Sequence, residues 1–125
     1  MKRNLRIMVI DDENIVGKRL KPALEKNGDV VETFTDARNA LERFSEQEFD
    51  IVVSDIRMDD IDGLEVLEQV LARSEKTKVI IITGYATVEV AQEALVKGAF
   101  DFIAKPFKPN DLRTIIDKAA KELGK

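Results

Sequence analysis

The chain contains no cysteine and no histidine among its 125 residues. Without cysteine it can form neither a disulfide nor a thiolate nucleophile, and without both residue types it lacks the usual ligands of structural zinc. The absence of histidine also excludes acid–base catalysis by an imidazole. Any chemistry must therefore use carboxylates, hydroxyls, lysines and a metal ion taken from solution.

Long apolar runs are also missing, since none approaches the roughly 20 residues needed to cross a bilayer. The basic start at 1–3 and the apolar run 7–10 superficially resemble a signal peptide, but the run is short and meets acidic residues without a cleavage site. We therefore expect a cytoplasmic protein. Its length suits one domain, 1–125, because a second domain would lack residues for its own core.

Strong positive charge is absent too, because 24 acidic residues outweigh 20 basic ones and give a net charge of −4. The basic residues are scattered and form no stripe, so we expect no direct nucleic-acid binding by this segment. The sequence also has neither a G-x-x-x-x-G-K-[ST] loop nor a G-x-G-x-x-G loop, which argues against the usual nucleotide-binding sites.

Five short runs rich in β-branched residues alternate with segments of helical period. The runs are 5–10, 30–34, 51–54, 79–82 and 100–104. Their almost continuous apolar character is typical of strands covered on both faces, as in a parallel sheet. Five β–α units with short links are too few for an eight-unit barrel, so we predict an α/β fold with an open, doubly wound, five-stranded parallel sheet.

The segments between these runs carry apolar stripes at helical spacing. The stripes are Val16, Leu20, Ala23 and Leu24; Ala37, Ala40, Leu41 and Phe44; Leu64, Leu67, Val70 and Leu71; Val88, Ala91, Ala94 and Leu95; and Leu112, Ile115, Ile116, Ala119 and Leu123. Pro22 should kink the first helix or shorten its last turn. Gly28 and Gly98 fall where helices should stop, and Pro109 and Gly124 can open and close the last helix.

Five polar residues follow four of the predicted strands. They are Asp11, Asp12, Asp55, Thr83 and Lys105. In an open doubly wound sheet, ligands bind beyond the carboxyl ends of the strands. A single aspartate there could simply cap a helix, but three carboxylates together need another explanation. Two carboxylates about 4 Å apart repel by roughly 4 kcal/mol at an effective dielectric near 20, so the cluster needs a cation or a bound proton.

Oxygen ligands with room for water suit Mg²⁺, which often bridges to a phosphate. Lys105 could be a structural counter-ion. With Mg²⁺ and the Thr83 hydroxyl it would also form a site for a tetrahedral dianion, and Asp55 could act as the nucleophile and become an aspartyl phosphate. We favour this second interpretation.

Four motifs lie in register at these strand ends. They are Val9-Ile10-Asp11-Asp12-Glu13, Asp55 with Met58 and Asp62-Gly63 after it, Ile82-Thr83-Gly84 and Lys105-Pro106-Phe107. Together they resemble the receiver domains of two-component response regulators over essentially the whole chain. The stretch 83–107 looks particularly like receivers fused to sigma-54-dependent transcription activators. The resemblance implies a flavodoxin-like sheet of strand order 2-1-3-4-5, with helices one and five on one face and two to four on the other.

The resemblance also implies a metal site and a phosphoryl acceptor. Asp55 would take a phosphoryl group from a phosphohistidine on a sensor histidine kinase. Asp12 and Asp55 would bind Mg²⁺ directly, and Asp11 would act mainly through water. The backbone carbonyl of Arg57 would complete the protein ligands. The domain would catalyse its own phosphorylation and dephosphorylation without being a turnover enzyme.

The switch is implied in the same way. Lys105 would bind a phosphoryl oxygen, and its peptide bond to Pro106 would be cis. Thr83 would move to hydrogen-bond the phosphoryl group, and Phe102 would swing inward, which shifts a pre-existing equilibrium. The fourth helix, fifth strand and fifth helix would then control an output domain or protein, and a homodimer could form through the same face.

Several residues give secondary expectations. Val90 and Val96 flank the stripe of the fourth helix, which partial burial explains about as well as a contact surface. The resemblance implies that Arg57 and Tyr85 flank the acceptor. Both are large enough to hinder an attacking water, so we predict a phosphoryl lifetime of minutes or longer. Asp59 replaces a proline usual in the family, and its loop is either simply solvated or alters Mg²⁺ affinity or dephosphorylation.

Two alternatives compete with a phosphorylated switch. A haloacid-dehalogenase-like phosphatase needs a second acid two residues after its nucleophile, where this chain has Arg57. A phosphorylation-independent, receiver-like interaction module is the other, although all five site residues are present. Flavin binding suits the architecture, but the acidic rim would repel a flavin phosphate.

Overall fold

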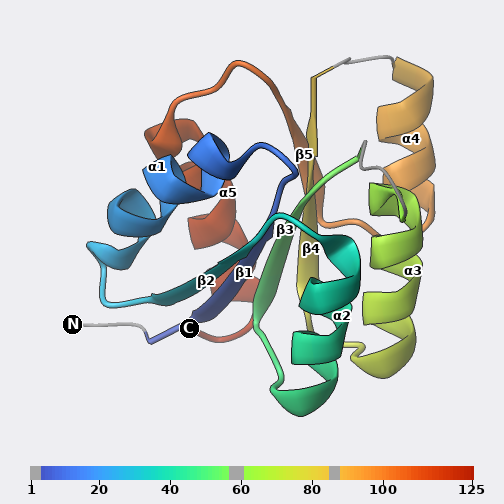
Figure 1. Ribbon diagram of the computed structural model, residues 1–125. Helices are drawn as coiled ribbons and strands as arrows, with labels where there is room; N and C mark the ends of the chain where they lie inside the picture. The colour runs from blue at the N-terminus through green and yellow to red at the C-terminus, as the bar shows by residue number, and fades with distance from the viewer. Residues whose placement is uncertain (1–3, 57–60, 85–87) are drawn as a thin grey trace.

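The computed structural model describes residues 4–56, 61–84 and 88–125. Five parallel strands form one sheet between two layers of helices (Figure 1). The elements are β1 (Arg6–Ile10), α1 (Asn14–Glu25), β2 (Val30–Phe34), α2 (Ala37–Glu46), β3 (Ile51–Asp55), α3 (Gly63–Arg73), β4 (Lys78–Thr83), α4 (Val88–Val96), β5 (Asp101–Ala104) and α5 (Pro109–Glu122). The strand order β2-β1-β3-β4-β5 confirms the predicted sheet.

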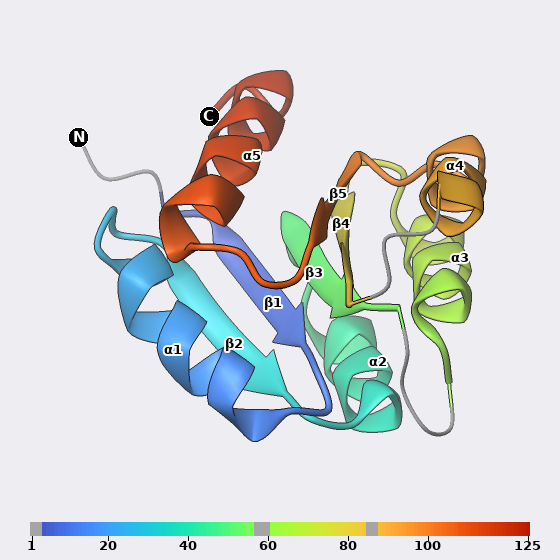
Figure 2. The same cartoon turned by 90° about the horizontal axis from the view of Figure 1, so that it is seen from above.

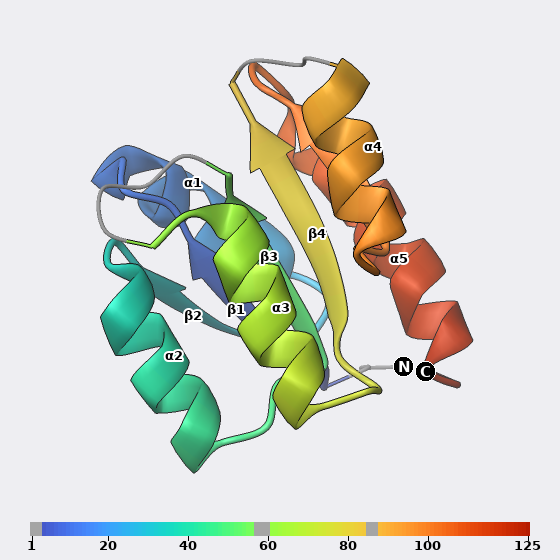
Figure 3. The ribbon, with the colours of Figure 1, turned by 90° about the vertical axis from the view of Figure 1, so that its right-hand side faces the viewer.

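The two faces of the sheet have separate hydrophobic cores. In β1, Ile7 and Val9 point to the face covered by α1 and α5, whereas Met8 and Ile10 point to α2, α3 and α4. Figure 2 shows the two layers on either side of the sheet, and Figure 3 shows the face with α2, α3 and α4. Side chains alternate between faces along a strand. The continuous apolar runs therefore arise because both faces are covered.

The helix ends largely follow the sequence. Gly28 and Gly98 adopt φ angles of 87° and 108°, a backbone conformation that favours glycine, and both lie just past helices as predicted. After α4, the Ala99 N–H donates to the Ala94 carbonyl over 2.9 Å. Pro109 opens α5, and Gly124, with φ of 78°, follows its end.

Two expectations about the helices were wrong in part. Pro22 does not end the first helix, because α1 continues to Glu25, and the alternative of a kink there stays a prediction. Proline has no N–H to donate to the Lys18 carbonyl. Because Lys18 and Pro22 are both exposed, water can donate to that carbonyl instead. Leu95 does not belong to the buried stripe of α4, since 43% of it is exposed, whereas Ala91 and Ala94 are buried.

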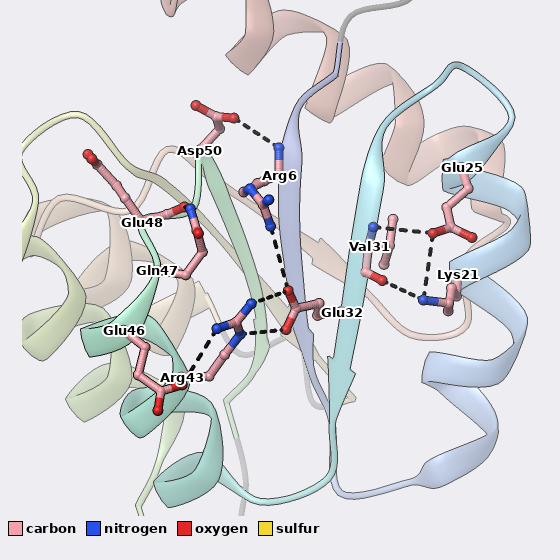
Figure 4. A network of polar contacts seen from close by, with 10 residues as sticks. All are labelled: Arg6, Lys21, Glu25, Val31, Glu32, Arg43, Glu46, Gln47, Glu48 and Asp50. Atoms are coloured by element: carbon pink, nitrogen blue, oxygen red, sulfur yellow. Dashed lines mark hydrogen bonds and ion pairs between the residues drawn. The ribbon is translucent and has the colours of Figure 1, made fainter.

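Charged side chains fasten the edge strand β2 to the helices on both sides (Figure 4). Arg43 of α2 donates two hydrogen bonds to the Glu32 carboxylate, of 2.8 and 3.1 Å. On the outer edge, Lys21 Nζ donates to the Val31 carbonyl over 2.7 Å, and the Val31 N–H donates to Glu25 Oε2 over 3.4 Å. The side chains of α1 thereby occupy backbone groups that an edge strand would leave unpaired.

Candidate functional site

Three aspartates meet at the carboxyl edge of the sheet, the upper edge in Figure 1. One carboxylate oxygen from each of Asp11, Asp12 and Asp55 lies within 4.8 Å of the others. Asp11 and Asp55 are buried, with 2% and 5% exposed, whereas Asp12 is exposed. The cluster therefore has two buried carboxylates and one open to solvent.

Strand pairing brings the aspartates together. Ile10 pairs with Ser54 across β1 and β3, so Asp11 and Asp55 extend from neighbouring strand ends. The Asp11 N–H donates to the Phe34 carbonyl of β2 over 3.0 Å. The Glu13 N–H donates to Asp11 Oδ1 over 2.8 Å, which fixes the orientation of that carboxylate. The position of the acids is thus set by backbone hydrogen bonds.

Lys105 places its ammonium among these acids. Its Nζ lies 2.9 Å from Asp11 Oδ2 and 3.2 Å from Asp55 Oδ2. It also lies 3.2 Å from Glu13 Oε1, a contact that the sequence reasoning missed. The Lys105 N–H donates to the Thr83 carbonyl over 2.8 Å, and the bond from Lys105 to Pro106 is cis, as expected.

Burial and charge act in opposite directions on these groups. Burial raises the pKa of Asp11. Its contact with Lys105 and the hydrogen bond from the Glu13 N–H oppose this only in part, and the nearby Asp55 charge adds to it. Burial lowers the pKa of Lys105, but its contacts with Asp11 and Asp55 outweigh that effect and raise it above the ordinary value. Lys105 therefore remains a cation that partly neutralises the cluster.

The donor set fits a hard divalent cation. Among the described residues, no hydrogen bond of good geometry reaches the buried Asp11 Oδ2, which lies 2.9 Å from the Lys105 ammonium. Carboxylate oxygens, one of them open to water, are ligands that Mg²⁺ prefers, because this ion keeps part of its hydration shell. The structure thus offers Asp11, Asp12 and Asp55 as a possible metal site.

The residues expected to form the switch lie on the two strands beyond β3. Thr83 is buried at the end of β4, immediately after Ile82, the residue that pairs with Asp55. Phe102 in β5 pairs with Ile81 and packs, partly buried, against the core on the α2–α4 face. The movement of both side chains on phosphorylation stays a prediction.

Arg57 and Tyr85 lie outside the described residues, as does Asp59. The expected metal contact of the Arg57 carbonyl and the expected shielding by both side chains therefore stay predictions. In α4, Val90 packs against the core, whereas Val96 is 87% exposed. Partial burial therefore explains Val90, whereas Val96 is free to belong to a contact surface.

Gly63 brings the start of α3 against the strand that carries Asp55. Its N–H donates to the Ile56 carbonyl over 2.9 Å. A Cβ atom at Gly63 would lie 2.5 Å from the Asp55 carbonyl oxygen and 2.6 Å from Ile56 Cα. The side chain of the preceding Asp62 caps the helix by accepting from the Glu65 N–H. Only a residue without a side chain fits this contact.

A parallel sheet of this strand order, with three acids and a lysine at its carboxyl edge, defines the receiver class of α/β proteins. Comparison with known proteins agrees. The model of the response regulator receiver domain family matches residues 7–117, and the chain belongs to this family. It is therefore a receiver domain of two-component response regulators, a family that interacts with histidine kinases and output domains.

Curated relatives point to regulators of transcription. The chain is 39% identical over 114 residues to the regulatory protein AtoC of Escherichia coli (strain K12), covering 91% of this chain and 25% of AtoC. It is 31% identical over 113 residues to the DNA-binding transcriptional regulator NtrC of Proteus hauseri, covering 90% of this chain and 24% of NtrC. This agrees with the resemblance to receivers of sigma-54-dependent activators. The chain spans about a quarter of the length of these relatives.

Solved structures give the same fold. A CheY-like receiver domain protein from Methanospirillum hungatei JF-1 matches with a TM-score of 0.92 and 31% identity, covering 98% of both chains. The beryllofluoride-activated NtrC4 receiver domain dimer matches with a TM-score of 0.89 and 33% identity, covering 94% of this chain and 98% of that one. Among the described residues, no helix is long and apolar enough to cross a membrane.

Proposed function

We propose that the chain is a phosphorylation-dependent signalling switch in which Asp55 accepts a phosphoryl group from a sensor histidine kinase. The observation that carries the proposal is the position of Asp55. Its carboxylate lies in the cluster with Asp11 and Asp12, and its Oδ2 is 3.2 Å from the Lys105 ammonium. A carboxylate nucleophile beside a fixed cation is suited to phosphoryl transfer, because positioning and charge supply most of the catalysis.

In the reaction, a carboxylate oxygen of Asp55 forms a bond to phosphorus while the phosphorus–nitrogen bond to the kinase histidine breaks, and the imidazole leaves. Lys105 binds a phosphoryl oxygen and neutralises part of its charge. Asp12 and Asp55 would hold Mg²⁺ directly, Asp11 mainly through water, and the Arg57 carbonyl would complete the ligands; the bound ion would supply further positive charge. Hydrolysis ends the signal: water attacks the phosphorus, the bond from phosphorus to Asp55 breaks, and inorganic phosphate leaves. The domain thus catalyses its own phosphorylation and dephosphorylation and is not a turnover enzyme.

The phosphoryl group adds nearly two negative charges and strong acceptor oxygens at one point. Thr83 moves and donates a hydrogen bond from its hydroxyl to a phosphoryl oxygen. Phe102 then moves into the space that Thr83 has left. Phe102 lies in β5 and Thr83 ends the neighbouring β4, so both lie close to the face formed by α4, β5 and α5. Phosphorylation therefore shifts this face toward the state that binds an output domain or protein, or a second copy of the chain.

We also propose the location and the lifetime of the phosphorylated state. Residues 1–125 form one receiver domain that acts in the cytoplasm and does not itself bind nucleic acid. Arg57 and Tyr85 restrict water near the acyl phosphate and give it a lifetime of minutes or longer. The kinship with AtoC and NtrC supports an output in transcription.

Intact-protein mass spectrometry after incubation with acetyl phosphate and Mg²⁺ tests the proposal. The expected result is one phosphoryl adduct on the wild type and none on Asp55→Asn or in the presence of a chelator. Absence of any adduct on a folded wild-type protein that binds Mg²⁺ would overturn the proposal. It would leave the phosphorylation-independent interaction module as the better explanation.

A further inference from the structure

Glu13 stands at the N-cap of α1 but does not cap the helix. Its φ and ψ angles of −86° and 107° are those of a capping residue, yet its side chain makes no capping hydrogen bond. A side-chain cap at this position typically contributes about 1 kcal/mol, and short side chains such as Ser or Asp provide it best. The Glu13 carboxylate instead lies 3.2 Å from Lys105 Nζ, across 92 residues of sequence.

We propose that Glu13 is a positioning residue for the phosphorylation of Asp55, a counter-ion that holds Lys105 in the unphosphorylated state and releases it to the phosphoryl group. This inference rests on the proposed function of Asp55. The role of Glu13 is to restrain Lys105, and this role is distinct from metal binding by the three aspartates.

The three partners of Lys105 differ in how easily they can be exchanged. Asp11 and Asp55 have side chains only 1% and 7% exposed, whereas the Glu13 side chain is 63% exposed. A buried carboxylate that loses its cation is left without solvation, but an exposed one turns into water at little cost. Glu13 is therefore the partner that a phosphoryl oxygen can replace.

The geometry of the ammonium supports this exchange. Lysine has three N–H donors, and three carboxylate oxygens lie within 3.2 Å of Lys105 Nζ. The ammonium donates hydrogen bonds to Glu13 and Asp55, so a phosphoryl oxygen on Asp55 competes with the Glu13 carboxylate for it. The Glu13 charge also repels an incoming phosphoryl donor, which is itself anionic. Both effects slow phosphorylation, and removal of the Glu13 charge relieves both.

The test compares Glu13→Gln with the wild type in acetyl phosphate labelling, with Mg²⁺ saturating for each protein. Saturation is needed because the lost charge also weakens Mg²⁺ binding, which a separate Mg²⁺ titration measures. We expect labelling about two- to fivefold faster at low salt, the range that exposed ion pairs support. The difference should shrink as salt rises, because salt screens exposed charges. A purely structural role of Glu13 would not produce this salt dependence.

Glu75→Gln is the matched control, since it removes the same charge from an exposed residue in the link between α3 and β4, at the opposite edge of the sheet. It should label at the wild-type rate. Beryllofluoride affinity gives a second readout and should increase for Glu13→Gln alone. If the wild type is labelled and Glu13→Gln is labelled at the same rate or more slowly, the Glu13 proposal is overturned and the function of Asp55 stays intact. Without labelling of either protein, both proposals fail.

Discussion

Replacement of Gly63 by alanine should strain the backbone that carries Asp55. The added Cβ would lie 2.5 Å from the Asp55 carbonyl oxygen and 2.6 Å from Ile56 Cα. Both atoms belong to the main chain, so no rotamer change can relieve the contact, and either α3 or the end of β3 must move. Overpacking of this kind costs about 1–3 kcal/mol, and alanine at the first residue of a helix recovers only part of it.

A net loss of about 2 kcal/mol is therefore expected in the free energy of unfolding. With a urea m-value of about 2 kcal/mol per M, the unfolding midpoint should fall by about 1 M. Circular dichroism during urea titration measures this directly. Acetyl phosphate labelling of the folded variant should also slow, because the contact presses on the nucleophile's own peptide group.

Two other glycines provide graded controls. A Cβ at Gly17 would lie 3.0 Å from Thr33 Cβ, a tight contact with a side chain, and the gain in helix propensity of about 0.5–1 kcal/mol offsets it. At Gly84 the nearest atom, Lys105 Cδ, is 4.0 Å away, so alanine should change stability by less than about 0.5 kcal/mol. A Gly63→Ala midpoint within about 0.2 M of the wild type would refute the reasoning.

Three further changes test other parts of the structure. Hydrogen bonds from Arg43 lower the pKa of Glu32 from 4.5, so the pair stabilises the fold above that pH and this stability is lost as pH falls through the lower folded-state value. Glu32→Gln should cost about 1 kcal/mol at pH 7 and nearly nothing at strongly acidic pH, measured by urea titration. Mg²⁺ at about 100 times its dissociation constant should stabilise the wild type by about 2.7 kcal/mol, and Asp12→Asn should remove most of this in thermal unfolding. The double change Lys21→Ala and Glu25→Ala exposes the outer edge of β2 and should cause concentration-dependent association in sedimentation velocity.

Each of these changes has an outcome that contradicts it. An equal cost of Glu32→Gln at neutral and acidic pH would show that packing, not charge, holds α2 on β2. Full Mg²⁺ stabilisation of Asp12→Asn would place the ion elsewhere. For the β2 edge, Lys18→Ala with Glu42→Ala removes the same charges from exposed positions. Equal association of both double variants would exclude a specific role of the edge contacts.

The parallel sheet and the residues that gather at its edge could be predicted, because local sequence patterns determine both. Buried parallel strands need apolar side chains on both faces, so runs such as 51–54 were recognisable without any structure. Since parallel strands end at one edge, placing Asp11, Asp55 and Lys105 after strands was enough to bring them together. The structure confirms that these three side chains lie together.

The misses arise from contacts between residues distant in sequence or from solvent. Glu13 was read only as part of an acidic motif, because nothing local shows that Lys105, 92 residues away, lies beside it. Gly63 was quoted as a motif without its steric reason, which appears only once α3 packs against Ile56. The continuation of α1 past Pro22 depends on exposure of its carbonyl partner to water, which a periodicity argument does not consider.

The place of Lys105 also bears on when the protein can fold. Zinc fingers must wait for their metal, because their ligands have no other partner. Here a cation encoded in the chain lies among the buried carboxylates, so a newly made chain can reach its final structure in a cell short of magnesium. On the proposed function, biosynthesis would thereby be separated from signalling: the supply of the divalent ion would decide whether the domain is phosphorylated, whereas the fold can form without it.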